Sequence, residues 1–395
     1  MISPLTGIKV LDLSRVLAGP FCSLLLADFG AEVIKVEQPG KGDDTRAFGP
    51  PFIKGESAYF LSINRGKKSV TIDLKTEKGK EIVGRLAEKS DVLLENFRPG
   101  VMEKLGFDYG SIRKINPRII YASISGFGST GPERMRPGYD LMIQGMGGIM
   151  SLTGAPDGPP YKVGASISDI LAGIYCFQGI LLALITRQKE GTGQKVDIGM
   201  MDSVVSILTH QAQNYFATGK SPHRRGNEHP TICPYETFEA SDDYINIAVG
   251  NDRIWQQFCD LLGLTEIKNN PRFSTNPKRV ENHDQLFPVI NAIMKRKPVG
   301  EWLKTFEEAE IPAGPILTLE EVLSHPQVLA RDMVVEVNHP SVGRLKLTGI
   351  PVKLSKTPGK IKSPPPLLGE HTEEVLSDLG YSKQEIEELK KDGVV

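Results

Sequence analysis

Cysteine is scarce in this chain, with four in 395 residues: Cys22, Cys176, Cys233 and Cys259. They lie far apart and none stands in a C-x-x-C spacing, which argues against a disulfide framework and against a thiolate zinc centre. The seven histidines show no H-E-x-x-H spacing. We therefore expect reduced core thiols and no metal site.

Three further sequence signatures are absent from the places where they would be diagnostic, and each absence disfavours a class of protein. No G-x-G-x-x-G follows the first strand-like run, where the glycines are Gly19 and Gly30, so a nicotinamide enzyme is poorly supported. No G-x-S-x-G elbow is present, which disfavours a thioester hydrolase of the α/β-hydrolase type. The start "MISPLTGIKVLDLSRV" lacks a basic region followed by a long apolar one, so we expect no signal peptide and a cytoplasmic protein.

The chain also lacks an excess of charge of either sign. It has 47 Lys and Arg against 48 Asp and Glu, a formal net charge of -1. This balance gives no reason to expect a nucleic acid or an anionic membrane as partner, and an anionic ligand must be met by a local basic cluster. The mostly apolar stretch 170–185 is too short for a membrane span, which needs about 20 residues, so we expect a buried helix there.

What the chain does contain is an alternation of short apolar strands and helices. Residues 8–14 form a predicted strand, 21–29 a helix ended by Gly30, and 32–37 a second strand, which together make a βαβ unit. Similar strands are predicted at 69–74, 91–97 and 118–128. This pattern is typical of an α/β fold with a doubly wound parallel sheet.

The change in pattern along the chain suggests three parts. Residues 1–224 are predicted to be the large Rossmann-like domain, and residues 225–329, with short strands and amphipathic helices, a smaller α+β domain. Residues 330–395 are expected to return to the large domain through the extended run "SPPP" and two short helices.

Basic residues recur where the predicted strands of the large domain end. Lys75 follows 69–74 and Arg98 follows 91–97, with Lys104 a little further on; Arg134 and Arg136 follow 118–128. A single surface charge is usually only solvated. Their recurrence at successive strand ends indicates a phosphate-bearing ligand along one rim of the sheet.

Asp169 stands at the start of the apolar stretch "GASISDILAGIYCFQGILLALITR" and allows two interpretations. An aspartate after small polar residues is a favoured helix N-cap, and local sequence alone favours that reading. The alternative is a reactive carboxylate beside an apolar, water-excluding wall.

Several segments resemble the class III CoA-transferases: "VLDLSRVLAGPFCSLLLADFGAEVIKVEQPGKGDDTR", "LLENFRPGVMEKLGFDY", "ISGFGSTGPERMRPGYDLMIQGMGG" and "PPPLLGEHT". The resemblance covers essentially the whole chain in order, and within the family the chain is most similar to the succinyl-CoA:glutarate, or dicarboxylate, type. It implies an interlocked homodimer with a Rossmann-like large domain. It also implies coenzyme A or an acyl-CoA as substrate and no permanently bound cofactor.

The resemblance places Asp169 at the family's catalytic aspartate. That residue would form a mixed anhydride with the acyl group and then an aspartyl-CoA thioester. Racemases of the same superfamily carry G-H-D where this chain has "GYD" with Tyr139, and a tyrosine, with a reference pKa of about 10, is a poor base at neutral pH. The resemblance thus favours transfer over racemisation, and a non-catalytic acyl-CoA binding protein is the other alternative.

The expected substrate-binding residues are Arg15, Arg46, Tyr139 and Gly250. Arg15 and Arg46 follow strand ends and are candidates for the distal carboxylate of the acceptor acid, a structural ion pair being the alternative. Gly250 in "VGND" and the run "QGMGG" (144–148) are candidate oxyanion donors, tight turns being the alternative. The resemblance implies a CoA site of Gln38, Leu74, Lys75, Asn96, Phe97, Arg98, Lys104 and Arg136. Gln38 stands where formyl-CoA transferase has an arginine, so an adenine-stacking guanidinium is missing.

Overall fold

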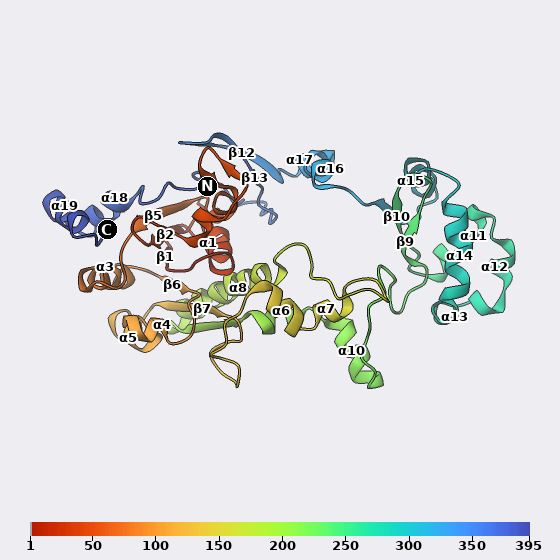
Figure 1. Ribbon diagram of the computed structural model, residues 1–395, viewed down its shortest axis with the longest axis horizontal. Helices are drawn as coiled ribbons and strands as arrows, with labels where there is room; N and C mark the ends of the chain where they lie inside the picture. Colours follow the sequence, from red (N-terminus) through yellow and green to blue (C-terminus); the bar gives the residue numbers. More distant parts are fainter. Residues whose placement is uncertain (1) are drawn as a thin grey trace. The chain divides into compact units, whose positions relative to one another are not determined.

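The computed structural model describes residues 2–395, which form two compact units (Figure 1). The large unit comprises the chain up to Met150, Lys162–Gly219 and Pro326–Val395, and the small unit comprises Ser151–Tyr161 and Lys220–His325. The predicted boundaries at 224 and 329 lie close to these breaks. The sequence did not predict that residues 151–161 belong to the small unit.

The large unit is built on a six-stranded parallel sheet in the order β5-β2-β1-β6-β7-β8. Its strands are β1 (Lys9–Asp12), β2 (Glu32–Glu37), β5 (Lys67–Thr71), β6 (Val92–Glu95), β7 (Ile120–Ser125) and β8 (Lys195–Gly199). Numbered within the sheet, this is the 3-2-1-4-5-6 order of the Rossmann fold. The predicted α/β class with a parallel sheet is confirmed.

Helices cover both faces of this sheet, because successive strand residues point to opposite sides. Val10 and Val92 face one core, with α1 (Ala18–Asp28), α8 (Ile167–Glu190) and α9 (Met200–Ser206). Leu11 and Leu93 face the other, with α3 (Glu77–Glu88), α5 (Tyr109–Ile115), α18 (Thr372–Asp378) and α19 (Lys383–Lys391). The apolar strands follow from burial on both faces.

Helix α8 is the one helix within residues 2–395 that is long and apolar enough to cross a membrane. Ala172, Cys176 and Ile180 belong to the core cluster of the sheet, and the helix packs against α1, α9, β7 and β8. One face of α8 therefore belongs to the core of the large unit, whereas Leu182 and Ile185 on the helix are exposed, so the predicted burial of 170–185 holds for part of the helix. All four cysteines are buried and free.

The C-terminal segment returns to the large unit and covers its outer strand β5. Helix α18 packs on β5, and its first residue, Thr372, accepts a hydrogen bond from the Thr71 backbone N–H at 3.0 Å. The His371 backbone N–H donates to the Ser69 carbonyl at 2.9 Å. Strand β5 ends at Thr71, earlier than the predicted 74, because beyond Ile72 the backbone pairs with the chain end: the Asp73 N–H donates to the Val394 carbonyl.

The small unit has its own core around a three-stranded antiparallel sheet in the order β11-β10-β9. The strands are β9 (Tyr235–Glu239), β10 (Tyr244–Ala248) and β11 (Ala313–Pro315). Trp255 of α11 (Asp252–Leu262), Ile290 of α14 (His283–Met294) and Phe306 of α15 (Val299–Glu308) are fully buried against it. The unit is therefore α+β.

The remaining elements lie outside the two main sheets and the helices packed on them. In the large unit they are η1 (Asp44–Ala47), β3 (Phe52–Ile53), β4 (Glu56–Ser57), α2 (Ala58–Ile63), α4 (Val101–Leu105), α6 (Asp140–Met146), α10 (Thr209–Thr218), α17 (Pro326–Ala330), β12 (Val334–His339) and β13 (Gly343–Thr348). In the small unit they are α12 (Thr265–Asn269), η2 (Pro271–Phe273), α13 (Asn276–Glu281) and α16 (Leu319–Ser324); α7 (Ile149–Leu152) lies at the first break.

Candidate active site

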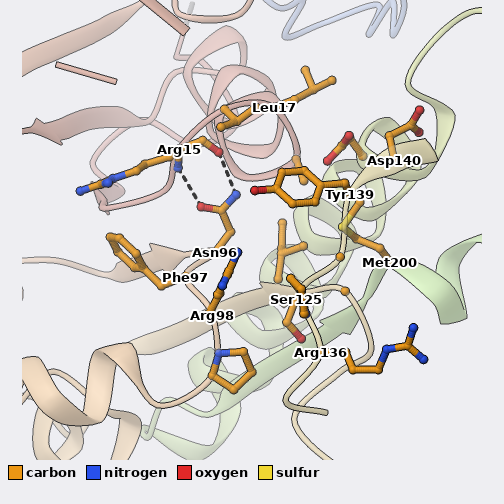
Figure 2. Close-up of a pocket in the computed structure, with 18 of the residues that line it drawn as sticks. Arg15, Leu17, Asn96, Phe97, Arg98, Ser125, Arg136, Tyr139, Asp140 and Met200 are labelled. Atoms are coloured by element: carbon orange, nitrogen blue, oxygen red, sulfur yellow. Dashed lines mark hydrogen bonds between the residues drawn. The ribbon is translucent and has the colours of Figure 1, made fainter. Parts of the chain in front are cut away.

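A cavity of about 290 Å³ opens in the large unit at the carboxyl ends of β1, β6 and β7 (Figure 2). The strand order reverses between β1 and β6, and open α/β sheets bind their ligands at such a switch point. The lining comes from segments that follow these strands and from the start of α8: residues 15–18, 96–99, 124–126 and 136–140, with Asp44, Asp169 and Met200. The cavity combines apolar walls with several charged side chains.

Asp169 is the third residue of α8, and its carboxyl group lies in the lining of this cavity. Among residues 2–395 no side chain forms an ion pair with it, and no hydrogen bond to its carboxyl oxygens is present. Burial, together with a smaller contribution from the neighbouring charge of Asp140, raises the pKa of Asp169 to about 7. An uncompensated carboxyl beside a cavity is a candidate reactive group.

The interpretation of Asp169 as the helix cap is wrong. The cap position is Ser166, and no side chain of the local sequence caps the helix, because Asp169 already lies within the first turn. Asp140 of α6 takes over this function: its Oδ1 accepts hydrogen bonds from the Ser168 N–H at 3.1 Å and from the Ser168 hydroxyl at 2.7 Å. Asp169 is thus left without a structural hydrogen bond.

The segment after β1 has a constrained backbone at the cavity edge. The Asn96 amide brackets Arg15: Oδ1 accepts from the Arg15 N–H at 2.7 Å, and Nδ2 donates to the Arg15 carbonyl at 2.8 Å (Figure 2). Val16 has φ of 66°, a left-handed conformation that is strained for a β-branched residue. Its N–H donates to both carboxyl oxygens of Asp43 at 3.3 Å, which holds the strained turn.

Three arginines line the cavity, and they differ in whether they are neutralised. Arg136 forms an ion pair with Glu133 at 2.8 Å, whereas Arg15 and Arg98 form none within residues 2–395. The Arg15 guanidinium lies 5.0 Å from the centre of the Phe97 ring. In Figure 2 the side chains of Arg15 and Arg136 both extend away from Tyr139. Since Arg15 and Arg98 form no ion pair, they are the two arginines of the cavity lining whose charge an anionic ligand could neutralise.

The predicted CoA residues divide between this cavity and a second one. Asn96, Phe97, Arg98 and Arg136 line the first. The second, of about 240 Å³, is lined by the other predicted group, Gln38, Leu74 and Lys75, and it shares Arg15 and Phe97 with the first. The two cavities thus adjoin at Arg15 and Phe97. Lys104 is exposed and lines neither.

Arg46 lies outside both linings and is already neutralised. Its Nε and Nη2 donate to the two carboxyl oxygens of Glu37, each at 2.7 Å, and its guanidinium stacks 3.6 Å from the centre of the Phe60 ring. A bidentate pair of this kind favours a structural role. The assignment of Arg46 to the acceptor acid stays a prediction that this geometry does not favour.

The two candidate oxyanion segments lie in different units. Gly250 is an exposed residue of the small unit, between β10 and α11. The run 144–148 ends helix α6 of the large unit, and Gln144 is fully buried there. Both assignments stay predictions.

Sequence reasoning missed two residues near Asp169. Asp140 is the third letter of "GYD", which was considered only for its tyrosine, yet it lines the cavity with Tyr139 and Asp169. Tyr59 of α2 is the other: burial raises its pKa to about 12, with the charges of Asp169 and Asp140 contributing. The motif could have revealed Asp140; nothing local marks Tyr59.

Within residues 2–395 no group of three or more His, Cys, Asp or Glu side chains could hold a metal ion. What the site offers is one uncompensated carboxylate, unpaired guanidinium groups and an adjoining cavity. These groups suit reaction of a carboxylate with an anionic, phosphate-bearing acyl compound.

Comparison with known proteins agrees with this chemistry. The chain is 42% identical over 395 residues to a mouse protein, succinyl-CoA:glutarate CoA-transferase, covering 100% of this chain and 91% of the other. It is 43% identical over 382 residues to succinate–glutarate CoA-transferase of Agrobacterium fabrum, covering 95% of this chain and 96% of the other.

A solved structure and a family profile extend this result. A CAIB/BAIF family protein from Brucella suis superposes with a TM-score of 0.86 at 44% identity, covering 96% of this chain and all of that one. Residues 5–372 match the profile of CoA-transferase family III. The chain belongs to CoA-transferase family III, as its sequence motifs indicated.

Proposed function

We propose that this protein transfers coenzyme A from an acyl-CoA donor, succinyl-CoA, to a small dicarboxylic acid such as glutarate, with Asp169 as nucleophile. The observation that carries the proposal is the position of Asp169, which lies in the switch-point cavity without a cation or a hydrogen bond on its carboxyl group. The names of the relatives support the substrates, since those proteins are succinyl-CoA-dependent transferases acting on glutarate and similar acids.

The first half of the reaction uses Asp169 as a carboxylate. Its oxygen attacks the thioester carbonyl, the C–S bond breaks, and CoA leaves as thiolate, which gives an anhydride between Asp169 and the succinyl group. The thiolate then attacks the Asp169 carbonyl of this anhydride and releases succinate. The product is an Asp169-CoA thioester.

The second half is the reverse sequence with a different acid. A carboxylate of the acceptor attacks the Asp169 thioester and expels CoA thiolate, forming a second anhydride. The thiolate attacks the acceptor's carbonyl, which yields the new acyl-CoA and restores the Asp169 carboxylate. Leu17, Ile124 and Met200 provide apolar walls that help exclude water, which would otherwise hydrolyse either anhydride.

The two adjoining cavities suit the two ends of CoA. The second cavity, with Gln38, Leu74 and Lys75, would take the nucleotide, and the first would take the thioester. Arg15 borders both, so its unpaired guanidinium can meet either a CoA phosphate or the distal carboxylate of the acid. Arg98, also unpaired, is the second candidate for that carboxylate.

We further propose that the protein is a homodimer, interlocked as the family resemblance implies, and that it acts in the cytoplasm. Large apolar side chains lie exposed on the large unit, including Leu182 and Ile185 of α8 and Phe216 of α10. Surfaces of this kind are commonly buried by a partner. Light scattering coupled to size-exclusion chromatography tests the dimer, and a monomer at micromolar concentration would refute it.

An exchange assay tests the activity. Purified protein is mixed with succinyl-CoA and a panel of acids that includes glutarate, and new acyl-CoA species are identified by mass spectrometry. Formation of glutaryl-CoA with release of succinate is expected. No exchange with any acid would refute the proposal, and deuterium uptake at the α-carbon of an acyl-CoA without an acceptor would favour the racemase alternative.

A further inference from the structure

We propose that Asp140 is a positioning residue for Asp169: its carboxylate replaces the missing local cap of helix α8 and fixes the turn that carries the nucleophile. The inference rests on the proposed function in that it takes Asp169 as the reacting group. Asp140 itself need not touch the acyl group for this role.

The first support is the hydrogen bonding at the start of α8. Ser166 at the cap position has φ of -74° and ψ of 69° and provides no side-chain cap, which leaves N–H groups of the first turn to be satisfied from elsewhere. Asp140 Oδ1 accepts from both the N–H and the hydroxyl of Ser168, which is fully buried. A carboxylate in this position also interacts favourably with the helix dipole.

The second support is that Asp140 is itself held from the opposite side. Its Oδ2 accepts a hydrogen bond at 2.8 Å from Nε2 of Gln144, one turn further along α6. Gln144 is fully buried, and its Oε1 accepts from the Val163 N–H at 2.8 Å. Asp140 and Gln144 thereby connect α6 with both the segment that leads into α8 and the first turn of α8.

This arrangement has a consequence for the charge of Asp169. The charged and titratable groups that share its surroundings come from six segments: Asp140 and Tyr139 at the start of α6, Arg136 before it, Tyr59 of α2, Asp44 of η1, Arg15 after β1 and Arg98 after β6. Of these, only Asp140 contributes resolvably to the raised pKa of Asp169, after burial. The residue that fixes the turn therefore also opposes ionisation of the nucleophile.

The chain offers a closely matched control in Asp108. As the cap of α5, Asp108 accepts from the Ser111 N–H at 3.1 Å and from the Ser111 hydroxyl at 2.6 Å. These are the two bonds that Asp140 makes to Ser168. Asp108 does not line the cavity of Asp169, so its substitution reports the effect of losing such a cap alone.

The experiment compares Asp140→Asn and Asp140→Ala with Asp108→Asn and Asp108→Ala. The titration of the Asp169 carboxyl is followed without substrate by ¹³C NMR of aspartate-labelled protein, its signal being assigned by its loss in Asp169→Asn. Asp140→Asn keeps an acceptor for Ser168, removes the charge and gives up the bond from Gln144 Nε2, and without the charge the midpoint is expected to fall by about one pH unit. The acid limb of the pH profile of kcat/KM should move in the same direction.

Asp140→Ala removes the cap as well as the charge. We expect the same shift of the midpoint together with a fall in kcat of about 100-fold, the size of effect that a small misplacement of a reacting group produces, while KM for acyl-CoA changes little. Ser168→Ala keeps the charge and removes one bond, so it should lower kcat several-fold without moving the midpoint. If Asp140→Ala does not fold, Ser168→Ala still tests whether the bond between Asp140 and Ser168 positions Asp169.

The two Asp108 variants should change neither the midpoint nor kcat. An unshifted Asp169 midpoint in Asp140→Asn, or a fall in kcat no larger for the Asp140 and Ser168 variants than for Asp108→Ala, would overturn the inference. An absence of exchange activity in the wild type would instead refute the proposed function. The NMR titration is independent of that activity and separates the two failures.

Discussion

Asp43 and Asp169 are both withdrawn from solvent in the large unit, yet their surroundings are opposite. The Asp43 carboxylate forms an ion pair with the Lys35 ammonium at 2.8 Å and accepts hydrogen bonds from the N–H and the hydroxyl of Thr45. Burial alone would raise the pKa of Asp43, but the Lys35 charge and these bonds lower it to about 2. Asp169 lacks such partners, and burial together with the charge of Asp140 raises its pKa to about 7.

The comparison shows where this fold satisfies its buried charges. Elsewhere in the large unit Asp43 pairs with Lys35, Glu37 with Arg46, and Asp28 with Arg65. Of these aspartates and glutamates, Asp43 also holds the strained turn at Val16, which lines the cavity. Asp169 is left unpaired, which is costly for stability and useful for a nucleophile.

The largest expected effect is the loss of activity on removing the unpaired carboxylate. Asp169→Asn should reduce exchange activity by about 10⁴-fold or more, as for other essential nucleophiles, because an amide is a far weaker nucleophile. Folding and CoA binding should persist, since Asp169 makes no structural hydrogen bond. Activity is followed by acyl-CoA exchange and binding by calorimetry; retention of a tenth of wild-type activity would contradict the assignment.

The paired carboxylate should behave in the opposite way, affecting stability first. Asp43→Asn leaves Lys35 buried without its partner, so we expect a loss of about 3–5 kcal/mol in unfolding free energy. The control is Asp44→Asn, the next residue, whose ion pair with Lys41 is exposed and should contribute less than about 1 kcal/mol. Urea unfolding measures both losses. Equal losses of unfolding free energy in Asp43→Asn and Asp44→Asn would contradict the prediction that the buried pair matters more.

The pH dependence of stability should differ in sign between the two residues. The folded pKa of Asp169 is above its unfolded value, so this group lowers stability as pH rises from about 4 to 7, and the deficit is constant above that. Asp43, with a lowered pKa, contributes stability that is present above about pH 4 and lost as pH falls through about 2. Asp169→Asn should therefore melt at a higher temperature than wild type at pH 8 and at a similar one at pH 4. A lower melting temperature at pH 8 would contradict this.

The smallest expected effect on stability concerns a charged pair of the small unit, in which His283 Nε2 lies 2.9 Å from Glu236. This carboxylate is the main cause that raises the pKa of His283 to about 9. Its stabilising contribution is complete below about pH 6.5 and is lost as pH rises through 9. His283→Gln should cost about 1 kcal/mol at pH 6 and almost nothing at pH 10. An equal cost at both pH values would show that the charge is not the cause.

Sequence patterns were sufficient for the parallel sheet. The family resemblance singled out Asp169 as a candidate, but neither patterns nor resemblance gave the contacts that surround it. Strand 32–37 was predicted with its observed bounds, because continuous apolar runs between turns are typical of buried parallel strands. The cap by Asp140 joins residues 28 positions apart, and the neutralisation of Arg46 depends on sheet geometry that places it beside Glu37. Local rules carry no information on either contact.

The most direct test of the central claim is to trap the covalent intermediate. Wild-type protein is incubated with succinyl-CoA alone, and its intact mass is measured before and after treatment with hydroxylamine, followed by peptide mapping. The account predicts a chain heavier by one CoA, replaced after treatment by a hydroxamate at Asp169, and no adduct in Asp169→Asn. A hydroxamate at another carboxylate, or an adduct that persists in Asp169→Asn, would contradict it.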